Sequence, residues 1–240
     1  TLPATGTYTV FVDPSGGGTG NVTITAYDVV DVNGSITIDG AAVQSTIGTP
    51  GQTGRYAFSG TAGQRVSVNS ISSTFTGCWT IAILKPDGSQ LASVFSCGSS
   101  SFMEPQTLPS TGTYTLLVDP SGAATGQVNV NLYGVVDGTG SLTLGGPAVN
   151  VSITTPGQNA ALTFSGTAGQ QATVRVTTNT MSCVRVTLLK PDGTAMTNTF
   201  SCGSAFNLAT QALTVTGTYT ITVDPSGANT GSLNLSVTNP

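Results

Sequence analysis

The stretch Gly112–Pro120 reads GTYTLLVDP, with Tyr, Leu and Val at every second position and threonines mostly between them. Alternation with a period of two is typical of a β-strand that is buried on one face. Nearly the same words stand at 6–14, GTYTVFVDP, and at 217–225, GTYTITVDP. The chain is therefore expected to be a repeat protein built from strands.

The repeat has the length of a whole domain. Asp13, Asp119 and Asp224 lie in three copies of V-D-P-S-G at intervals of 106 and 105 residues. The motif F-S-G-T-A-G-Q begins at Phe58 and again at Phe164, 106 residues later. Solenoid rungs are only about 20–50 residues long. The spacing therefore predicts a tandem array of similar domains.

Val-Val-Asp stretches mark the expected boundaries between units. Cutting there predicts two complete repeats, 31–136 and 137–240. Residues 1–30 match only the last quarter of a repeat and are predicted to be the terminal hairpin of an incomplete one. Because the links are short, neighbouring units are expected to lie against one another.

Turn residues divide each unit into short alternating runs. They recur about every 8–12 residues, which is the spacing of strands in a β-sandwich. K-P-D-G at 85–88 and 190–193 stands between two such runs and predicts tight hairpins. No segment has helical periodicity. The predicted fold class is all-β, with tandem antiparallel β-sandwiches of a jelly-roll or immunoglobulin-like type, each with about eight or nine strands.

The composition excludes several classes of function. Of the 240 residues, 38% are hydrophobic and only 7% charged, whereas about 25% is usual for charged residues. The six Lys and Arg are scattered, so no nucleic-acid partner is expected. No apolar run approaches the roughly 20 residues of a membrane helix, so no membrane span is expected. A weakly charged, hydroxyl-rich surface favours an extracellular structural protein.

Residue types for catalysis are scarce. The chain has no His, which removes the commonest general base and zinc ligand. Its one glutamate, Glu104, has no counterpart in the other unit, whereas a hydrolase of the two-carboxylate type needs a pair of acids. We therefore expect that the chain is not an enzyme and needs no cofactor.

Two cysteine pairs flank the two P-D-G turns. Cys78 and Cys97 are 19 residues apart, as are Cys183 and Cys202. A hairpin folded about the turn brings each pair together, although a bulge at the glycine would shift the register by one residue. Four cysteines allow three pairings, and the repeat favours the two within units. A four-thiolate metal site is the alternative, but the close C-x-x-C spacing is missing. Disulfides predict an oxidising, extracellular compartment.

Other residues are candidates for binding sites. The repeated Asp13, Asp119 and Asp224 are candidate calcium ligands, but we favour a role as caps of their turns. Trp79 is a candidate platform for a sugar, yet its place in an alternating strand favours the core. Four N-x-S/T triplets are weak candidates for glycosylation, because such triplets are frequent by chance in a Thr-rich chain. They begin at Asn21, Asn33, Asn150 and Asn234.

The order of the motifs resembles a known bacterial domain. F-S-G-T-A-G-Q, an alternating strand into P-D-G, then T-G-T-Y-T with V-D-P-S-G and a last alternating strand are similar to the pre-peptidase C-terminal domain. The resemblance covers 56–133, 162–237 and, for the closing part, 1–27. It implies a jelly-roll-like sandwich and a non-catalytic module of secreted proteins, some of which bind calcium or an extracellular polymer. The acidic strand that often precedes P-D-G in the family has no carboxylates here, which argues against a calcium site.

Two functions fit these observations. The first is a structural repeat of a bacterial surface fibre or filament, whose partners are copies of itself or adjacent repeats, head to tail. The second is an accessory module of a secreted hydrolase that binds a polysaccharide or a protein, and it predicts exposed aromatic residues in both units. The repeated pairs Phe58/Phe164 and Tyr114/Tyr219 follow inward positions, which favours the structural repeat.

Residues 1–27 are predicted to form a hairpin, but the rest of a repeat does not precede them in this sequence. Strands are expected at 6–13 and 20–27, and an isolated two-stranded hairpin is marginal in water. We predict that it is ordered only by contact with another unit, either upstream in a longer array or on a neighbouring subunit by strand addition. The inward side chains expected to make this contact are Tyr8, Val10, Val12, Val22 and Ile24.

Overall fold

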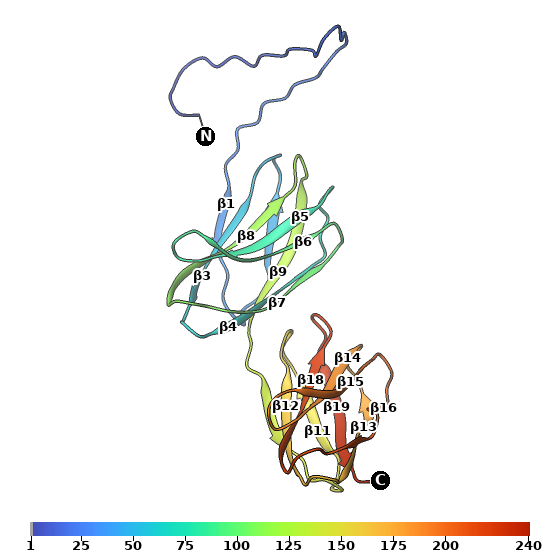
Figure 1. Ribbon diagram of the computed structural model, residues 1–240. Helices are drawn as coiled ribbons and strands as arrows, with labels where there is room; N and C mark the ends of the chain where they lie inside the picture. Colours follow the sequence, from blue (N-terminus) through green and yellow to red (C-terminus); the bar gives the residue numbers. More distant parts are fainter. Residues whose placement is uncertain (1) are drawn as a thin grey trace.

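The computed structural model describes residues 2–240, so Thr1 of the expected terminal hairpin lies outside the described residues. Residues 2–240 form 19 strands and no helix, and the strands make two successive β-sandwiches (Figure 1). The all-β class predicted from the alternation is confirmed. No helix in the described part of the chain is long and apolar enough to cross a membrane.

The first sandwich consists of β1–β9. One sheet has the strand order β1-β3-β8-β5-β6, and the other has the order β2-β9-β4-β7. The bounds are β1 (Val32–Ser35), β2 (Val43–Ile47), β3 (Gly54–Gly60), β4 (Arg65–Ile71), β5 (Trp79–Leu84), β6 (Gln90–Ser96), β7 (Ser101–Thr107), β8 (Gly112–Pro120) and β9 (Gly126–Gly134).

The second sandwich consists of β10–β19 and repeats this arrangement. Its sheets have the orders β10-β12-β18-β14-β15 and β11-β19-β13-β16, with the short β17 also paired to β13. The bounds are β10 (Gly138–Ser141), β11 (Val149–Ile153), β12 (Ala160–Gly166), β13 (Gln171–Asn179), β14 (Val184–Leu189), β15 (Ala195–Ser201), β16 (Phe206–Asn207), β17 (Gln211–Ala212), β18 (Gly217–Pro225) and β19 (Gly231–Thr238).

One strand pair in each sandwich is parallel, in an otherwise antiparallel fold. β1 runs parallel to β3, and β10 runs parallel to β12. The chain leaves β1, forms β2 in the opposite sheet and returns as β3, so it enters β3 in the direction in which it left β1. A parallel pair needs a crossover of this kind.

The arch β8–β9 joins the two sheets of the first sandwich: its two strands lie in opposite sheets and do not pair with each other, so the hairpin expected for this motif is wrong. β8 lies between β3 and β5 in one sheet, and β9 lies between β2 and β4 in the other. Tyr114, Leu116 and Val118 of β8 are fully buried, as are Val128 and Val130 of β9. The alternation along Gly112–Pro120 therefore identified the core face of an interior strand correctly.

The terminal segment, residues 2–30, contains no strand. The strands expected at 6–13 and 20–27 do not form in the isolated chain, where no other unit lies beside the segment. Their formation on contact with another unit stays a prediction. The segment runs out beyond the first sandwich as an open loop (Figure 1), where its backbone has no sheet to pair with. The side chains that the alternation assigned to an inward face are exposed, namely Tyr8, Val10, Val12, Val22 and Ile24.

Candidate functional site: the junction between the sandwiches

The second sandwich holds the linker that precedes it through two side chains. The Asp137 carboxylate accepts a hydrogen bond of 3.0 Å from the backbone N–H of Asn159. Gln158 Nε2 donates one of 2.9 Å to the carbonyl of Val136. The linker therefore leaves the sandwich in a fixed direction.

The first sandwich holds its own preceding residues in the same way. Asp31 accepts a 3.0 Å hydrogen bond from the N–H of Thr53, and Gln52 Nε2 donates one of 2.6 Å to the carbonyl of Val30. Sequence analysis used Val-Val-Asp only as a boundary and missed this role. The available signal was T-P-G-Q, which recurs at 49–52 and 155–158 at the same spacing as Val-Val-Asp.

The two sandwiches contact each other directly. Arg65 Nη1 of β4 lies 2.6 Å from Asp137 Oδ2, and the Arg65 carbonyl accepts a 2.9 Å hydrogen bond from the N–H of Val135. The hydroxyl of Ser67, which is fully buried, donates to the carbonyl of Pro156 at 2.7 Å. A partly exposed ion pair contributes only about 0–1 kcal/mol. These contacts therefore set the relative orientation of the sandwiches more than they add stability.

A glycine turn of the second sandwich packs under β7 of the first. Gly157 has φ +85°, and a Cβ there would lie 2.8 Å from Pro105 Cγ and 3.2 Å from Phe102 Cζ. Gly51, the same position in the first sandwich, has φ +82° and only Val29 Cγ2 nearby, at 3.8 Å. Gly157 is buried and Gly51 is exposed. The turn that the junction covers in one sandwich is thus open in the other.

Two carboxylates near the junction have raised pKa values. Burial raises the pKa of Glu104 on β7, and the charge of Asp224 raises it further. Burial also raises the pKa of Asp224, which Arg185 lowers and Asp137 raises. A raised pKa means that the assembled state favours the protonated carboxyl. Repulsion at the junction therefore falls as the pH drops through the range in which these groups protonate.

The repeated aspartates lie in a different place from the one expected. Asp119 is exposed near the end of β8, and Asp13 lies on the exposed terminal segment. Asp224 lies on the outer face near the end of β18, where neighbouring groups partly desolvate its carboxyl. The position in a turn that the sequence predicted is therefore wrong for Asp119 and Asp224. Among residues 2–240, no group of three or more His, Cys, Asp or Glu side chains is placed to hold a metal ion.

The aspartates that do cap turns are those of P-D-G. Asp87 accepts hydrogen bonds from the N–H and the hydroxyl of Ser89, at 2.9 and 2.6 Å. Asp192 accepts the equivalent bonds from Thr194, at 2.9 and 2.7 Å. These bonds stabilise the charged carboxylate and lower the pKa of both aspartates. Their role is to shape the turn that leads to the disulfides.

Each P-D-G hairpin is closed by a disulfide, and a bulge sets its register. Next to the turn Leu84 pairs with Gln90, but one step further Ile83 pairs with Ala92. Without this shift the first cysteine would stand opposite Ser96, so the bulge aligns the cysteines instead of separating them. The second sandwich has the same shift in β14–β15. The disulfides are Cys78–Cys97 and Cys183–Cys202.

We expect peptide mapping of the unreduced protein to recover one linked pair of peptides from each hairpin. The bulge places the two cysteines of each hairpin directly opposite one another, with Cα atoms 4.0 Å apart. A disulfide requires the two Cα atoms to lie within about 7 Å of each other. Mass spectrometry of a digest at low pH, with a reduced sample as the control, checks the pairing. Free thiols, or a link between the two sandwiches, would contradict it.

Trp79 belongs to the core, as the alternation favoured. It is fully buried, and its indole N–H donates to the carbonyl of Gly98 at 3.2 Å. A buried indole cannot stack on a sugar, so the alternative role is wrong.

The candidate glycosylation sites differ in their surroundings. Asn150 and Asn234 face each other on β11 and β19, where Asn150 Nδ2 donates to Asn234 Oδ1 at 3.0 Å. Asn33 Nδ2 donates to the carbonyl of Asp31 at 3.1 Å. Asn21 is exposed on the terminal segment. Glycosylation of these asparagines stays a prediction.

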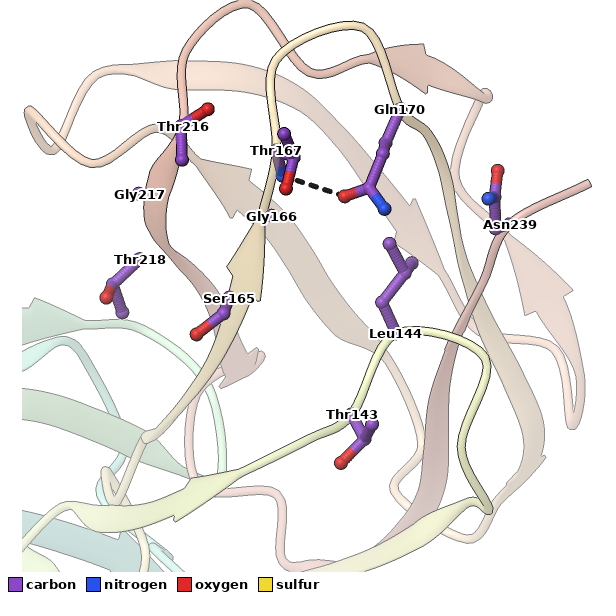
Figure 2. A pocket seen from close by; sticks show the side chains of 10 residues that line it. All are labelled: Thr143, Leu144, Ser165, Gly166, Thr167, Gln170, Thr216, Gly217, Thr218 and Asn239. Carbon is purple, nitrogen blue, oxygen red and sulfur yellow. Dashed lines mark hydrogen bonds between the residues drawn. The ribbon is translucent and has the colours of Figure 1, made fainter.

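A shallow polar groove recurs at the same place on both sandwiches. It measures about 490 Å³ in the second (Figure 2) and about 610 Å³ in the first. Gln170 accepts a 2.7 Å hydrogen bond from the N–H of Thr167, drawn as a dashed line in Figure 2, and Gln64 accepts one of 3.1 Å from Thr61. The residues that line either groove include no charged side chain. The grooves therefore offer uncharged hydroxyls and amides beside apolar side chains such as Leu144 and Ile38.

One pair of repeated aromatic residues is exposed, contrary to the expectation that repeated aromatics lie inward. Phe95 on β6 is 63% exposed and Phe200 on β15 is 52% exposed. The guanidinium of Arg185 lies 5.5 Å from the centre of the Phe200 ring. The two phenylalanines begin the repeated motif F-S-C-G, at 95–98 and 200–203. Both residues lie on outer strands, where one face remains open to solvent.

Comparison with known proteins does not assign the chain to a family. No family model matches it, and no curated protein matches it. Among solved structures it is similar to the pre-peptidase C-terminal domain of a collagenase from Bacillus anthracis, with 13% identity and a TM-score of 0.36. That similarity covers 42% of this chain and 96% of the other.

Two further solved structures are similar at the same low level. One is PliG of Aeromonas hydrophila, a periplasmic inhibitor of g-type lysozyme, with 17% identity, a TM-score of 0.31 and coverage of 43% of this chain and 99% of that one. The other is the PBSX exported protein XepA, with 12% identity, a TM-score of 0.31 and coverage of 84% and 88%.

Proposed function

We propose that the chain is a non-catalytic structural repeat of an extracellular protein of the pre-peptidase C-terminal type. Its sandwiches stack head to tail, as the building blocks of a bacterial surface fibre or filament. The observation that carries the proposal is the junction, where Ser67 and Arg65 of one sandwich bond the turn and linker of the next. A tether between independent modules needs no such contacts.

Two further features support the proposal. Disulfides form and persist in oxidising compartments, so the two hairpin disulfides indicate folding outside the reducing cytosol. The hydrogen bonds that Asp31 and Gln52 make to the preceding residues repeat those of Asp137 and Gln158. A body placed before residue 31 would therefore be directed onto the exposed Gly51 turn, as the first sandwich is directed onto the Gly157 turn.

We expect Gly157→Ala to loosen the joint between the sandwiches, because its Cβ meets Pro105 and Phe102 across the junction. Gly51→Ala is the matched control: it has the same turn and nearly the same φ, but its Cβ meets only Val29 at 3.8 Å. Both changes add about 1 kcal/mol of backbone strain, and only the first adds a clash between sandwiches. Small-angle X-ray scattering of the two variants should give a broader range of overall lengths for Gly157→Ala.

The comparison between the two glycine variants decides the outcome. If Gly157→Ala kept the same distribution of lengths as Gly51→Ala and wild type, the contacts across the junction would not set the joint, and the proposal of a stacked repeat would fail. Calorimetry of each sandwich separates a change at the joint from a loss of folding.

A second candidate function is an accessory module that binds a polysaccharide. The exposed Phe95 and Phe200 favour it, because an aromatic ring open to solvent at the same place in both sandwiches suits a sugar face. The guanidinium of Arg185 lies over the Phe200 ring, however, within the reach of a cation–π contact. The stacked repeat therefore remains the better supported function.

A further inference from the structure

The terminal segment already has two of the local hydrogen bonds of the β8–β9 arch. Tyr8 is bonded through its hydroxyl to the backbone of Ala4, as Tyr114 is bonded to Ser110. Its turn is closed by a backbone hydrogen bond of 3.2 Å, where the turn of β8–β9 has one of 3.1 Å. The local geometry is formed, and only the pairing with other strands is missing.

The side chains of the segment are exposed where their counterparts are buried. Tyr8 is 48% exposed and Val10 is 69% exposed, whereas Tyr114 and Leu116, at the equivalent positions of β8, are fully buried. Ile24 is 52% exposed, and its counterpart in β9 is buried. Removal of apolar surface from water is the main driving force for folding and association. The segment therefore has a strong tendency to enter a core.

The place of β8–β9 in the sandwich defines which core fits. β8 is paired on both sides, by β3 and β5, and β9 is paired on both sides, by β2 and β4. The arch thus supplies one interior strand to each of the two sheets. Tyr114 also stacks on Phe58 of β3, with the ring centres 5.4 Å apart. An arch of this type therefore fits a sandwich in which the interior strand of each sheet is missing and a phenylalanine equivalent to Phe58 lies on the neighbouring strand.

We propose that the terminal segment is a donor arch for a sandwich of this repeat that lacks its own β8–β9 arch, a body equivalent to residues 32–107. Residues 6–13 become an interior strand of one sheet and residues 20–27 an interior strand of the other. Together they complete the core of that body. This inference rests on the proposed repeat function, since the acceptor must be another unit of the same type. The side chains that fill the acceptor core are Tyr8, Val10, Val12, Val22 and Ile24.

A complete sandwich is not the partner. In both sandwiches of this chain the interior places are already occupied, by β8–β9 and by β18–β19. A second intact copy offers only its outer strands, such as β1 and β6. Pairing there would satisfy one edge of one strand and leave the apolar face of the segment in water. The segment therefore discriminates an incomplete unit from a complete one.

A graft into the full chain tests whether the segment can complete a body. Residues 213–238 are replaced by residues 2–27, a segment of the same length. In this chimera Tyr8 takes the position of Tyr219, and Gly20 takes the position of Gly231. We expect the second sandwich of this chimera to unfold as one cooperative transition. Amides of the grafted strands should exchange at least 100-fold more slowly than the same amides in the intact chain's terminal segment. A chain that ends at residue 212 supplies the reference that lacks both strands.

Two variants of the chimera show whether the fit is that of an interior strand. Val10→Asp puts a charge on the inward face and should abolish the protection, whereas Phe11→Asp, on the outward face, should leave most of it. If the second sandwich of the chimera were as sensitive to protease as the chain that ends at residue 212, the proposal would be overturned. Loss of protection in both variants alike would overturn it as well.

The intact chain provides an independent check. Sedimentation of the wild type should reveal no self-association that Val10→Asp removes, because both of its sandwiches are complete. Association that depends on Val10 would indicate edge pairing and would overturn the proposal. These measurements report on the folding of one sandwich, while Gly157→Ala reports on the joint between two. Failure of one inference is thus distinguishable from failure of the other.

Discussion

Replacement of Trp79 by alanine is expected to destabilise the first sandwich by about 3–5 kcal/mol. The indole is fully buried on β5, donates to the Gly98 carbonyl at 3.2 Å, and packs against Phe75 with ring centres 5.9 Å apart. Truncation leaves a cavity and removes the partner of a carbonyl. A domain has only about 5–15 kcal/mol of stability. Calorimetry should therefore show a large downward shift of one transition and little change in the other.

The second sandwich supplies the control for Trp79. Val184 stands at the equivalent position, and Met181, which takes the place of Phe75, is buried in the same core. We expect Trp79→Val with Phe75→Met to recover part of the stability that Trp79→Val alone loses, because the flexible methionine fills space that the half-buried Phe75 does not. An unchanged first transition in Trp79→Ala would contradict the assignment of Trp79 to the core.

Replacement of Gly126 by alanine is expected to destabilise the first sandwich by about 2–5 kcal/mol. Gly126 has φ +145°, a conformation that residues with a side chain rarely adopt. A Cβ there would lie 2.7 Å from the carbonyl oxygen of Thr74 and 2.8 Å from Phe75 Cα, and backbone atoms cannot move aside as a side chain can. Urea unfolding, followed by the fluorescence of the single Trp, reports on this sandwich alone.

Gly88 separates the two causes of this effect. It has φ +81° in the P-D-G turn, and no atom lies within 4 Å of the place where its Cβ would stand. Gly88→Ala therefore adds strain without a clash and should cost about 1 kcal/mol. Equal losses in Gly88→Ala and Gly126→Ala would mean that the contact with Thr74 and Phe75 does not matter.

The sequence alone determined the all-β class and the core faces of its interior strands. Alternation is a property of one strand, because its side chains point to opposite faces in turn. Gly112–Pro120 could therefore be assigned an inward face without knowledge of its neighbours. The same local pattern placed Trp79 in the core and the P-D-G turns between paired strands. Where the pattern met no partner, as in residues 6–27, it predicted strands that the single chain does not form.

Only the tertiary structure decided which strands pair and which surfaces meet. The parallel pairing of β1 with β3, the interior position of β8, and the contact of Ser67 with Pro156 join residues far apart in the chain. The exposure of Phe95 follows from the outer position of β6, which no local pattern encodes. Whether an apolar residue is buried depends on what covers it. The terminal segment closely resembles β8–β9 in sequence, and its valines remain in water because no sheet lies beside them.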